Sequence, residues 1–233
     1  MRKIVLTGAS GGIGQAILEQ LMQAGDRVVA CCSGHPERIP VSTQTTLFAG
    51  DLSRPEEVNR LFELVKKEFG APDALINCAG IADIRLMQDS DDDNLLKLMN
   101  TNLLSCIRCT KEAVKLMLPK QAGKIINISS VWGLVGASCE AEYSATKGGI
   151  DAYTKAAAKE LAPSGIPVNA LSLGAFDTEM NALLSPEDRE ALKEEIPAGR
   201  LGKPEEAAQM VMLLLDAPVY LTGAVIKLDG GWI

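Results

Sequence analysis

Histidine is nearly absent from this sequence of 233 residues, which contains only His35. A serine–histidine–aspartate hydrolase and a histidine-rich metal site both need imidazole at the reacting centre. The sequence therefore excludes a triad hydrolase, and we expect no metal site. His35 itself either lies in a surface loop or helps to bind a ligand, and its position leaves both alternatives open.

Long apolar runs and an excess of positive charge are also missing. No apolar stretch reaches the roughly 18 residues needed to span a bilayer. Lys and Arg number 23 against 30 Asp and Glu, which gives a net charge of −7 and argues against binding to nucleic acid or to an anionic membrane. The first residues enter a predicted strand without the apolar segment of a secretory signal, so we expect a cytoplasmic protein.

The six cysteines do not form a recognisable metal or disulfide pattern. Cys106 and Cys109 form a Cys-x-x-Cys motif, but no second pair completes a zinc site. The motif also lies within a helical pattern over residues 103–118, whereas redox motifs lie at strand-to-helix turns. We therefore expect reduced, buried thiols that act as small apolar side chains.

Short apolar runs rich in β-branched residues alternate with longer segments of helical periodicity. The predicted strands are residues 3–7, 27–32, 45–50, 74–77, 124–129, 167–172 and 224–228. The predicted helices are residues 12–24, 55–69, 94–118, 143–161 and 204–215. Ser53 and Ser185 each lie three residues before an acid, with proline between, which is typical of helix starts. This alternation predicts one doubly wound α/β domain over residues 1–233, with about seven parallel strands and helices on both faces.

A glycine cluster lies between the first predicted strand and the first predicted helix. Gly8, Gly12 and Gly14 allow the backbone to turn tightly and to approach a pyrophosphate closely. The free N–H groups and the dipole of the helix N-terminus would then hold the negative charge. A cluster in this position is typical of a dinucleotide-binding Rossmann domain.

The spacing Gly-x-x-x-Gly-x-Gly resembles that of the short-chain dehydrogenase/reductase family, which the rest of the chain also matches from end to end. Asp51 resembles the family's adenine-contacting Asp, and residues 77–80 resemble its Asn-Asn-Ala-Gly element with Cys78 in place of the second Asn. Leu173 stands where the family has proline before Gly174. The cofactor contacts implied by the resemblance are Gly8, Ser10, Gly12, Ile13, Gly14, Asp51, Leu52, Asn77, Ala79, Gly80, Tyr143, Lys147, Gly174 and Thr178.

Four residues match the family's catalytic set, namely Asn102, Ser130, Tyr143 and Lys147. Tyr143 and Lys147 are four residues apart on a predicted helix and therefore share a face. A phenol holds its proton at neutral pH, and a nearby ammonium favours the phenolate, which makes proton transfer feasible. Ser130 can donate a hydrogen bond to the substrate carbonyl and its developing oxyanion. The resemblance implies that Asn102 keeps a relay water in line and that Lys147 also holds the nicotinamide ribose.

The end of the second predicted strand lacks the acid that NAD enzymes use to bind the ribose hydroxyls. Ser33, His35 and Arg38 stand there instead, and their hydroxyl, imidazole and guanidinium groups suit a 2′-phosphate. We therefore predict that the cofactor is NADP(H).

Residues 197–207 and 222–231 resemble the C-terminal segments of 3-oxoacyl-acyl-carrier-protein reductases. The resemblance implies NADPH-dependent reduction of a 3-oxoacyl thioester to a secondary alcohol, as in fatty acid biosynthesis, with Tyr143 as proton donor. The partner would be acyl carrier protein and the assembly a homotetramer. A non-enzymatic NADP(H) sensor is a remote alternative, because such proteins usually lose the tyrosine or the lysine.

The substrate prediction has an alternative. Reductases of carrier-protein substrates tend to have arginines flanking the site, and those positions hold Gln121 and Ser164, although Lys120 and Lys124 could partly substitute. Residues 132–140 are expected to line the substrate pocket through Trp132 and Glu140. This segment resembles a subgroup that reduces a 5-aminopentanone group on translation elongation factor P. Glu140 would then either cap the following helix or receive the substrate ammonium.

Overall fold

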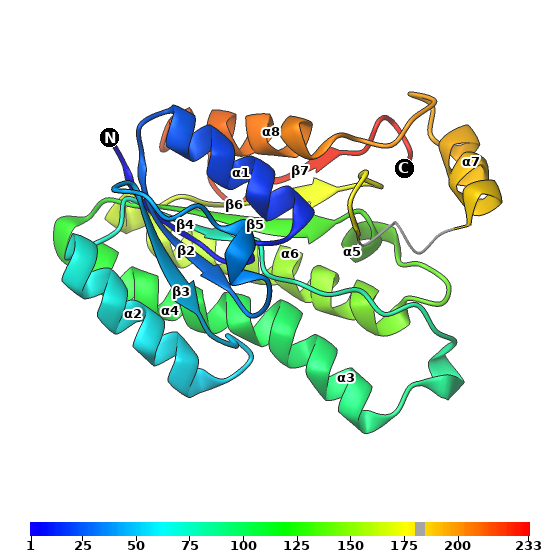
Figure 1. Ribbon diagram of the computed structural model, residues 1–233, viewed down its shortest axis with the longest axis horizontal. Coiled ribbons are helices and arrows are strands. Elements are labelled where there is room, and N and C mark those ends of the chain that lie inside the picture. Colours follow the sequence, from blue (N-terminus) through cyan, green and yellow to red (C-terminus); the bar gives the residue numbers. More distant parts are fainter. Residues whose placement is uncertain (180–184) are drawn as a thin grey trace.

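The computed structural model describes residues 1–179 and 185–233 and confirms the predicted α/β class. Seven parallel strands form one sheet in the order β3-β2-β1-β4-β5-β6-β7 (Figure 1). The strands are β1 (Lys3–Leu6), β2 (Arg27–Cys32), β3 (Thr45–Ala49), β4 (Ala74–Asn77), β5 (Lys124–Ser130), β6 (Val168–Leu173) and β7 (Val225–Leu228). Each predicted strand is present. The prediction succeeded because a continuous apolar run is typical of a parallel strand that is buried on both faces.

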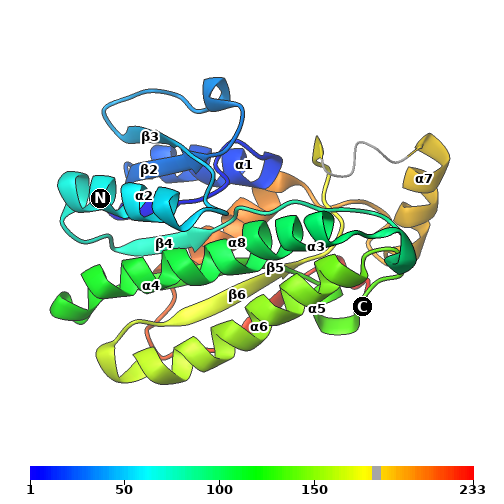
Figure 2. The same cartoon turned by 90° about the horizontal axis from the view of Figure 1, so that it is seen from below.

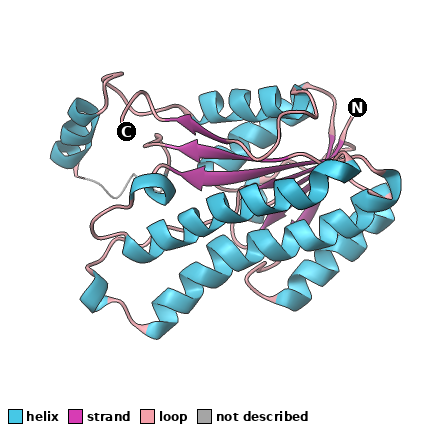
Figure 3. Ribbon diagram, turned by 180° about the vertical axis from the view of Figure 1, so that it is seen from behind, coloured by secondary structure: helices cyan, strands magenta, loops and turns pink. Residues whose placement is uncertain are grey.

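Helices cover both faces of the sheet, as predicted. The helices α1 (Gly12–Gln23) and α8 (Pro204–Asp216) pack on one face, with Ile4, Leu6 and Ile126 among the buried strand residues beneath them. The helices α2 (Pro55–Phe69), α4 (Ser105–Met117) and α6 (Ala141–Leu161) cover the other face (Figure 1, Figure 2). Figure 3 shows the sheet between these two helical layers from behind.

The remaining helices either lie outside the two layers or continue one of the helices that form them. They are α3 (Asp92–Leu98), α5 (Trp132–Val135) and α7 (Pro186–Glu195), with short 3₁₀ helices at Pro36–Arg38, Met87–Asp89, Leu118–Lys120 and Ala162–Ser164. Figure 1 places α7 beyond the carboxyl ends of the strands. None of the described helices is both long and apolar enough to cross a membrane, and no described group of acidic, histidine or cysteine side chains has the arrangement of a metal site.

The predicted helix over residues 94–118 is not continuous. It consists of α3, a π-helical segment over Met99–Leu104 and α4. A π-helical turn accommodates one more residue than an α-helical turn, and such insertions often occur at functional sites. Asn102 lies in this segment, and its side chain is completely buried.

The two predicted capping serines differ in outcome. The Ser185 hydroxyl accepts a hydrogen bond from the Asp188 N–H at 3.1 Å and caps α7, as predicted. Ser53 does not cap α2: it lies one residue before the N-cap, and its own N–H donates to Asp51 Oδ1 at 3.0 Å in a turn before the helix. Arg54 is the N-cap residue of α2, and its side chain makes no capping hydrogen bond.

The cysteines are free thiols, as expected. Four of them are buried, and burial raises the pKa of Cys106 to about 12. The thiol of Cys106 lies 3.4 Å from Asn127 Oδ1 in the core between β5 and α4.

The strand order creates a crevice at the carboxyl edge of the sheet. From β1 the chain builds outward to β2 and β3, and it then returns to place β4 on the other side of β1. The loops after β1 and β4 therefore diverge at this edge, which is where open α/β sheets bind their ligands.

Candidate active site

The glycines after β1 allow three loops to meet. Gly8 has a φ of +68°, and a Cβ at this position would lie 2.7 Å from the backbone nitrogen of Ala79, after β4. A Cβ at Gly14 would lie 2.0 Å from the carbonyl oxygen of Gly8. A Cβ at Gly12 would lie 2.9 Å from Cγ2 of Thr178, in the loop after β6. Any larger side chain at these positions would force the backbone segments apart.

Thr7 fixes the distance between the loops after β1 and β4. Its buried hydroxyl oxygen accepts hydrogen bonds from the N–H groups of Cys78 at 3.0 Å and Ala79 at 3.1 Å. Our sequence prediction omitted Thr7. The signal that could have revealed it is a hydroxyl residue at the end of the first strand, directly before the first glycine.

These loops enclose a cleft of about 840 Å³ along the carboxyl edge of the sheet. A volume in this range suits a sizeable organic ligand. Most of the predicted site residues line it, namely Gly8, Ser10, Gly12, Ile13, Gly14, Ser33, His35, Arg38, Asp51, Leu52, Ala79, Gly80, Ser130, Tyr143, Lys147, Gly174 and Thr178. Four predicted site residues do not line this cleft, namely Asn77, Asn102, Trp132 and Glu140.

The side chain of Asn77 is directed into the core instead of the cleft. Its amide donates to Thr110 Oγ1 at 3.1 Å and to Asn127 Oδ1 at 2.9 Å. Asn127 in turn donates to Thr154 of α6 at 2.9 Å, so a buried polar network joins β4, β5, α4 and α6. The Asn77 side chain therefore does not line the cleft, because the network engages its Nδ2, and a cofactor contact at Asn77 stays a prediction.

Asn102 clamps the backbone of the loop after β4. Its Oδ1 accepts from the Ile81 N–H at 2.8 Å, and its Nδ2 donates to the Ile81 carbonyl at 2.9 Å. The same Nδ2 lies 3.3 Å from Thr146 Oγ1 on α6. The π-helical turn brings Asn102 to this position, where it joins the cleft loop to the helix that carries Tyr143.

Ser130, Tyr143 and Lys147 all line the cleft, where they are supplied by the end of β5 and by α6. Ser130 ends β5, and its hydroxyl oxygen accepts from the Trp132 N–H at 3.2 Å. Lys147 is buried, donates from Nζ to the Ile128 carbonyl at 3.0 Å and lies 5.6 Å from the centroid of the Tyr143 ring. The sequence prediction that these three residues share one site is consistent with this arrangement.

The cleft also contains the residues predicted to bind a 2′-phosphate. Arg38 Nη1 pairs with Glu179 Oε2 at 2.8 Å, and this pairing lowers the pKa of Glu179 and raises that of Arg38. His35 has a φ of +53° and places Nδ1 3.0 Å from Glu37 Oε1. The carboxylates of Glu179 and Glu37 are exposed and Arg38 is partly exposed, so exchange of a carboxylate for another anion would cost little.

Glu140 and Trp132 form a separate group beside the cleft. Glu140 is the N-cap residue of α6, but its side chain makes no capping hydrogen bond. Burial raises the pKa of its carboxyl group, and a hydrogen bond with the Trp132 side chain opposes this effect. The Trp132 ring packs edge-on against Trp232, with 4.7 Å between the ring centroids.

The positions compared with docking arginines lie at the far edge of the sheet. Gln121 precedes β5, and Ser130 ends it, about 20 Å away along the strand. Gly165, next to Ser164, lies against the Gln121 carbonyl, so both positions share that distant edge. In a single chain, Gln121 and Ser164 therefore do not flank the site, and the expectation that they do is wrong.

The two lysines considered as substitutes are engaged elsewhere. Lys120 donates to Asp73 Oδ1 at 2.8 Å, and Lys124 donates to the Leu215 carbonyl at 2.6 Å and to the Ala217 carbonyl. Lys124 thus binds the C-terminal end of α8, and burial lowers its pKa. Neither lysine is free to receive an acidic partner near the cleft.

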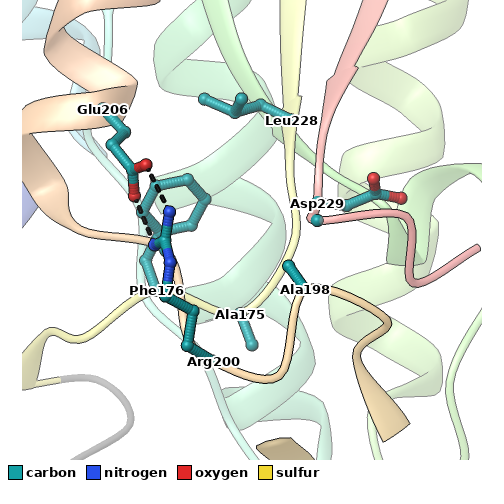
Figure 4. A pocket seen from close by; sticks show the side chains of 9 residues that line it. Ala175, Phe176, Ala198, Arg200, Glu206, Leu228 and Asp229 are labelled. Carbon is teal, nitrogen blue, oxygen red and sulfur yellow. Dashed lines mark hydrogen bonds and ion pairs between the residues drawn. The ribbon is translucent and has the colours of Figure 1, made fainter.

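A smaller cavity of about 120 Å³ adjoins the cleft, and Phe176 lines both. Figure 4 shows Arg200 and Glu206 joined there by two hydrogen bonds, of 2.8 and 2.7 Å. The Arg200 guanidinium, with the Lys203 N–H, lowers the pKa of Glu206 to about 2. The pair fastens the chain around Gly202, which forms a β-bridge with Phe176, and so supports the loop after β6.

Comparison with known proteins agrees with this geometry. A family model described as enoyl-(acyl carrier protein) reductase matches residues 8–233. The 3-oxoacyl-[acyl-carrier-protein] reductases of Pseudomonas aeruginosa and Vibrio cholerae are 37% and 34% identical to this chain, and each match covers 97% of it and 95% of the relative. Carbonyl reductase family member 4 of Danio rerio is 37% identical over 99% of this chain and 97% of its own.

A crystal structure from Agrobacterium tumefaciens, of a protein assigned as a gluconate dehydrogenase, has the same fold. It is 33% identical, with a TM-score of 0.93 over 99% of this chain and 95% of its own. The names of these relatives agree on oxidoreductase chemistry and differ in the substrate.

Gly8→Ala should weaken the binding of NADPH at least tenfold, because the new Cβ would push the loops after β1 and β4 apart. Gly25→Ala is the matched control, since Gly25 has a φ of +78° and a Cβ there would meet no atom within 4 Å. Both variants carry the backbone strain of a left-handed alanine, roughly 1–2 kcal/mol. Isothermal titration calorimetry with NADPH should separate them, and equal dissociation constants would refute a binding role for the Gly8 contact.

Proposed function

The chain belongs to the short-chain dehydrogenase/reductase family of oxidoreductases, and from this we propose that it reduces a ketone to a secondary alcohol with NADPH. The observation that carries the proposal is that Ser130, Tyr143 and Lys147 line the same cleft as the glycines after β1. Proton transfer and hydrogen bonding to a carbonyl are what these three side chains provide together.

The cleft residues fit a nicotinamide dinucleotide. Gly8, Gly12 and Gly14 leave backbone close to the cleft where side chains would otherwise fill it. The first turn of α1 contains no acid, and Gly11 provides no side-chain cap, so the first N–H groups of the helix are available to a pyrophosphate. Lys147 and Asp51 line the same cleft, where Lys147 would hold the nicotinamide ribose and Asp51 would contact the adenine.

The chemistry of reduction is divided between the cofactor and the protein. A reduced nicotinamide supplies the hydride when it is bound. Tyr143 donates the proton that the new alkoxide requires, and Lys147 stabilises the resulting phenolate through its positive charge. Ser130 donates a hydrogen bond to the carbonyl oxygen, and this bond becomes more favourable as negative charge develops there.

The preference for NADPH rests on the residues after β2. Ser33, His35 and Arg38 line the cleft there, and β2 ends at Cys32 without an acid. A 2′-phosphate would replace the exposed Glu179 carboxylate on Arg38. The phosphate carries more charge than a carboxylate and suits the planar guanidinium, which favours this exchange.

For the substrate we propose a 3-oxoacyl thioester, on the strength of the relatives named as 3-oxoacyl-acyl-carrier-protein reductases. A homotetramer, a cytoplasmic location and a single domain over residues 1–233 complete the proposal. Other basic residues would have to bind a docked acyl carrier protein, because Lys120 and Lys124 form hydrogen bonds at the edge of the sheet opposite the cleft.

A second candidate substrate is a ketone that carries an ammonium group, such as the 5-aminopentanone group on elongation factor P. The observation that favours it is the state of Glu140. Its partly buried carboxyl group neither caps α6 nor pairs with a cation in the described part of the chain. A substrate ammonium would supply the positive charge that the Glu140 carboxyl group lacks. The engagement of Lys120 and Lys124 elsewhere also favours this substrate over one carried by an acidic protein.

Tyr143→Phe should lower the turnover of ketone reduction by about 10²–10⁴, because it removes the proton donor and leaves the ring. Tyr153→Phe, on the same helix, is the matched control and should retain activity. Calorimetry should find NADPH binding intact in both variants. Turnover within tenfold of the wild type in Tyr143→Phe would show that another group donates the proton.

Ser33→Asp should shift the ratio of kcat/KM for NADPH and NADH at least tenfold toward NADH, because a carboxylate repels the 2′-phosphate and binds ribose hydroxyls. Ser164→Asp adds the same charge at the far edge of the sheet and should leave the ratio unchanged. Steady-state kinetics with both cofactors measure this ratio of kcat/KM values. A wild-type kcat/KM for NADH that equals or exceeds the value for NADPH would contradict the cofactor proposal.

Glu140→Gln should raise KM for an aminoketone by roughly tenfold, about 1.4 kcal/mol, and leave KM for a neutral β-ketoester unchanged. Glu142→Gln makes the same change two residues later and should affect neither substrate. If Glu140→Gln alters both substrates equally, Glu140 has only a structural role and the ammonium candidate fails.

A further inference from the structure

Asp151 is a buried acid on the face of α6 that carries the reactive residues. Tyr143, Lys147 and Asp151 are four residues apart and follow one another along that face, with exposures of 9%, 5% and 3%. The other buried acid among the described residues is Asp26, which pairs with Arg2 at 2.7 Å. The contrast between the two acids is informative, because a buried charge ordinarily requires a partner.

Asp151 has no ion-pair partner of this kind among the described residues. Neither of its carboxylate oxygens accepts a hydrogen bond of good geometry from the described residues. From β5, the Ser129 hydroxyl faces Asp151 and also lies 3.3 Å from the Lys147 carbonyl, so a neutral hydroxyl is the polar group that β5 offers to this acid. From α5, Gly133 covers it so closely that a Cβ would lie 2.9 Å from Asp151 Oδ2.

Two cations act on Asp151, and both belong to α6. Burial raises the pKa of the Asp151 carboxyl group, while Ser129, Lys155 and Lys147 oppose the rise. Lys155 is exposed, so water and salt screen its charge. Lys147 is buried, and its ammonium donates a hydrogen bond to the neutral Ile128 carbonyl.

Lys147 and Asp151 are therefore two buried groups of opposite charge, one helical turn apart, each without an ion-pair partner in the described chain. We propose that Asp151 is a positioning residue whose negative charge balances Lys147 and sets the pH above which Tyr143 loses the proton it donates. This inference rests on the proposed function. Glu37 and Glu179, the acids beside the predicted 2′-phosphate site, already pair with His35 and Arg38.

The direction of the effect follows from electrostatics. A negative charge disfavours the phenolate, so its removal should let Tyr143 ionise at lower pH. Eight residues of helix separate the two positions by about 12 Å. With an effective dielectric constant near 20, a unit charge at this distance shifts an ionisation by roughly 0.5–1 pH unit.

The first experiment compares the pH dependence of kcat for ketone reduction in the wild type, Asp151→Asn and Glu160→Gln. Asp151→Asn preserves the size of the side chain and removes its charge. Glu160→Gln removes the same charge from an exposed position on α6 and is the matched control. The alkaline limb should move to lower pH by roughly 0.5–1 unit in Asp151→Asn and stay in place in Glu160→Gln.

The second experiment needs no turnover. The chain has three tyrosines, so phenolate absorbance can be titrated in each background with and without Tyr143→Phe, and the difference belongs to Tyr143. Tyr153 interferes little, because burial raises its pKa to about 12. The midpoint of the Tyr143 signal should fall in Asp151→Asn by the same amount as the alkaline limb.

The outcomes are distinct. A purely structural role would lower stability without moving either midpoint, and superimposable profiles for Asp151→Asn and the wild type would overturn the inference. Asp151→Ser provides a second neutral variant if the asparagine does not fold. A wild type that reduces no ketone would refute the proposed function, while the phenolate titration would still decide the role of Asp151.

Discussion

The close approach of Gly8 to the backbone of Ala79 is the constraint on which the cleft depends. The loops after β1 and β4 come from adjacent parallel strands, and they can touch only where one of them has no side chain. Thr7 then locks the contact with two hydrogen bonds to the neighbouring loop. The helix N-terminus at Gly12 is thereby aimed along the edge of the sheet.

The same loop transmits this constraint to the reacting groups. Ile81 follows the contact by two residues and is held at both backbone groups by Asn102. Asn102 also meets Thr146, whose hydroxyl donates to the Tyr143 carbonyl at 2.7 Å. A continuous set of polar contacts therefore ties the glycine loop to the helix that carries Tyr143.

The sheet, the glycine loop and the trio of Ser130, Tyr143 and Lys147 could be predicted from the sequence, because apolar periodicity and residue spacing are local signals. Contacts made across the fold could not. Asn77 was expected in the cleft, and a network that depends on residues 33 and 50 positions away draws it into the core. Gln121 is a different case, because the predicted strand over residues 124–129 already separates it from Ser130.

The packing of Trp132 against Trp232 has an optical consequence. These are the two tryptophans of the chain, and both belong to one corner, where α5 meets the last turn after β7. Indole emission from this protein therefore reports on that corner alone. An unfolding curve followed by tryptophan emission would record the release of the C-terminal residues from α5, whereas circular dichroism would record the loss of the helices, and the two curves would coincide only if the corner and the sheet unfold together.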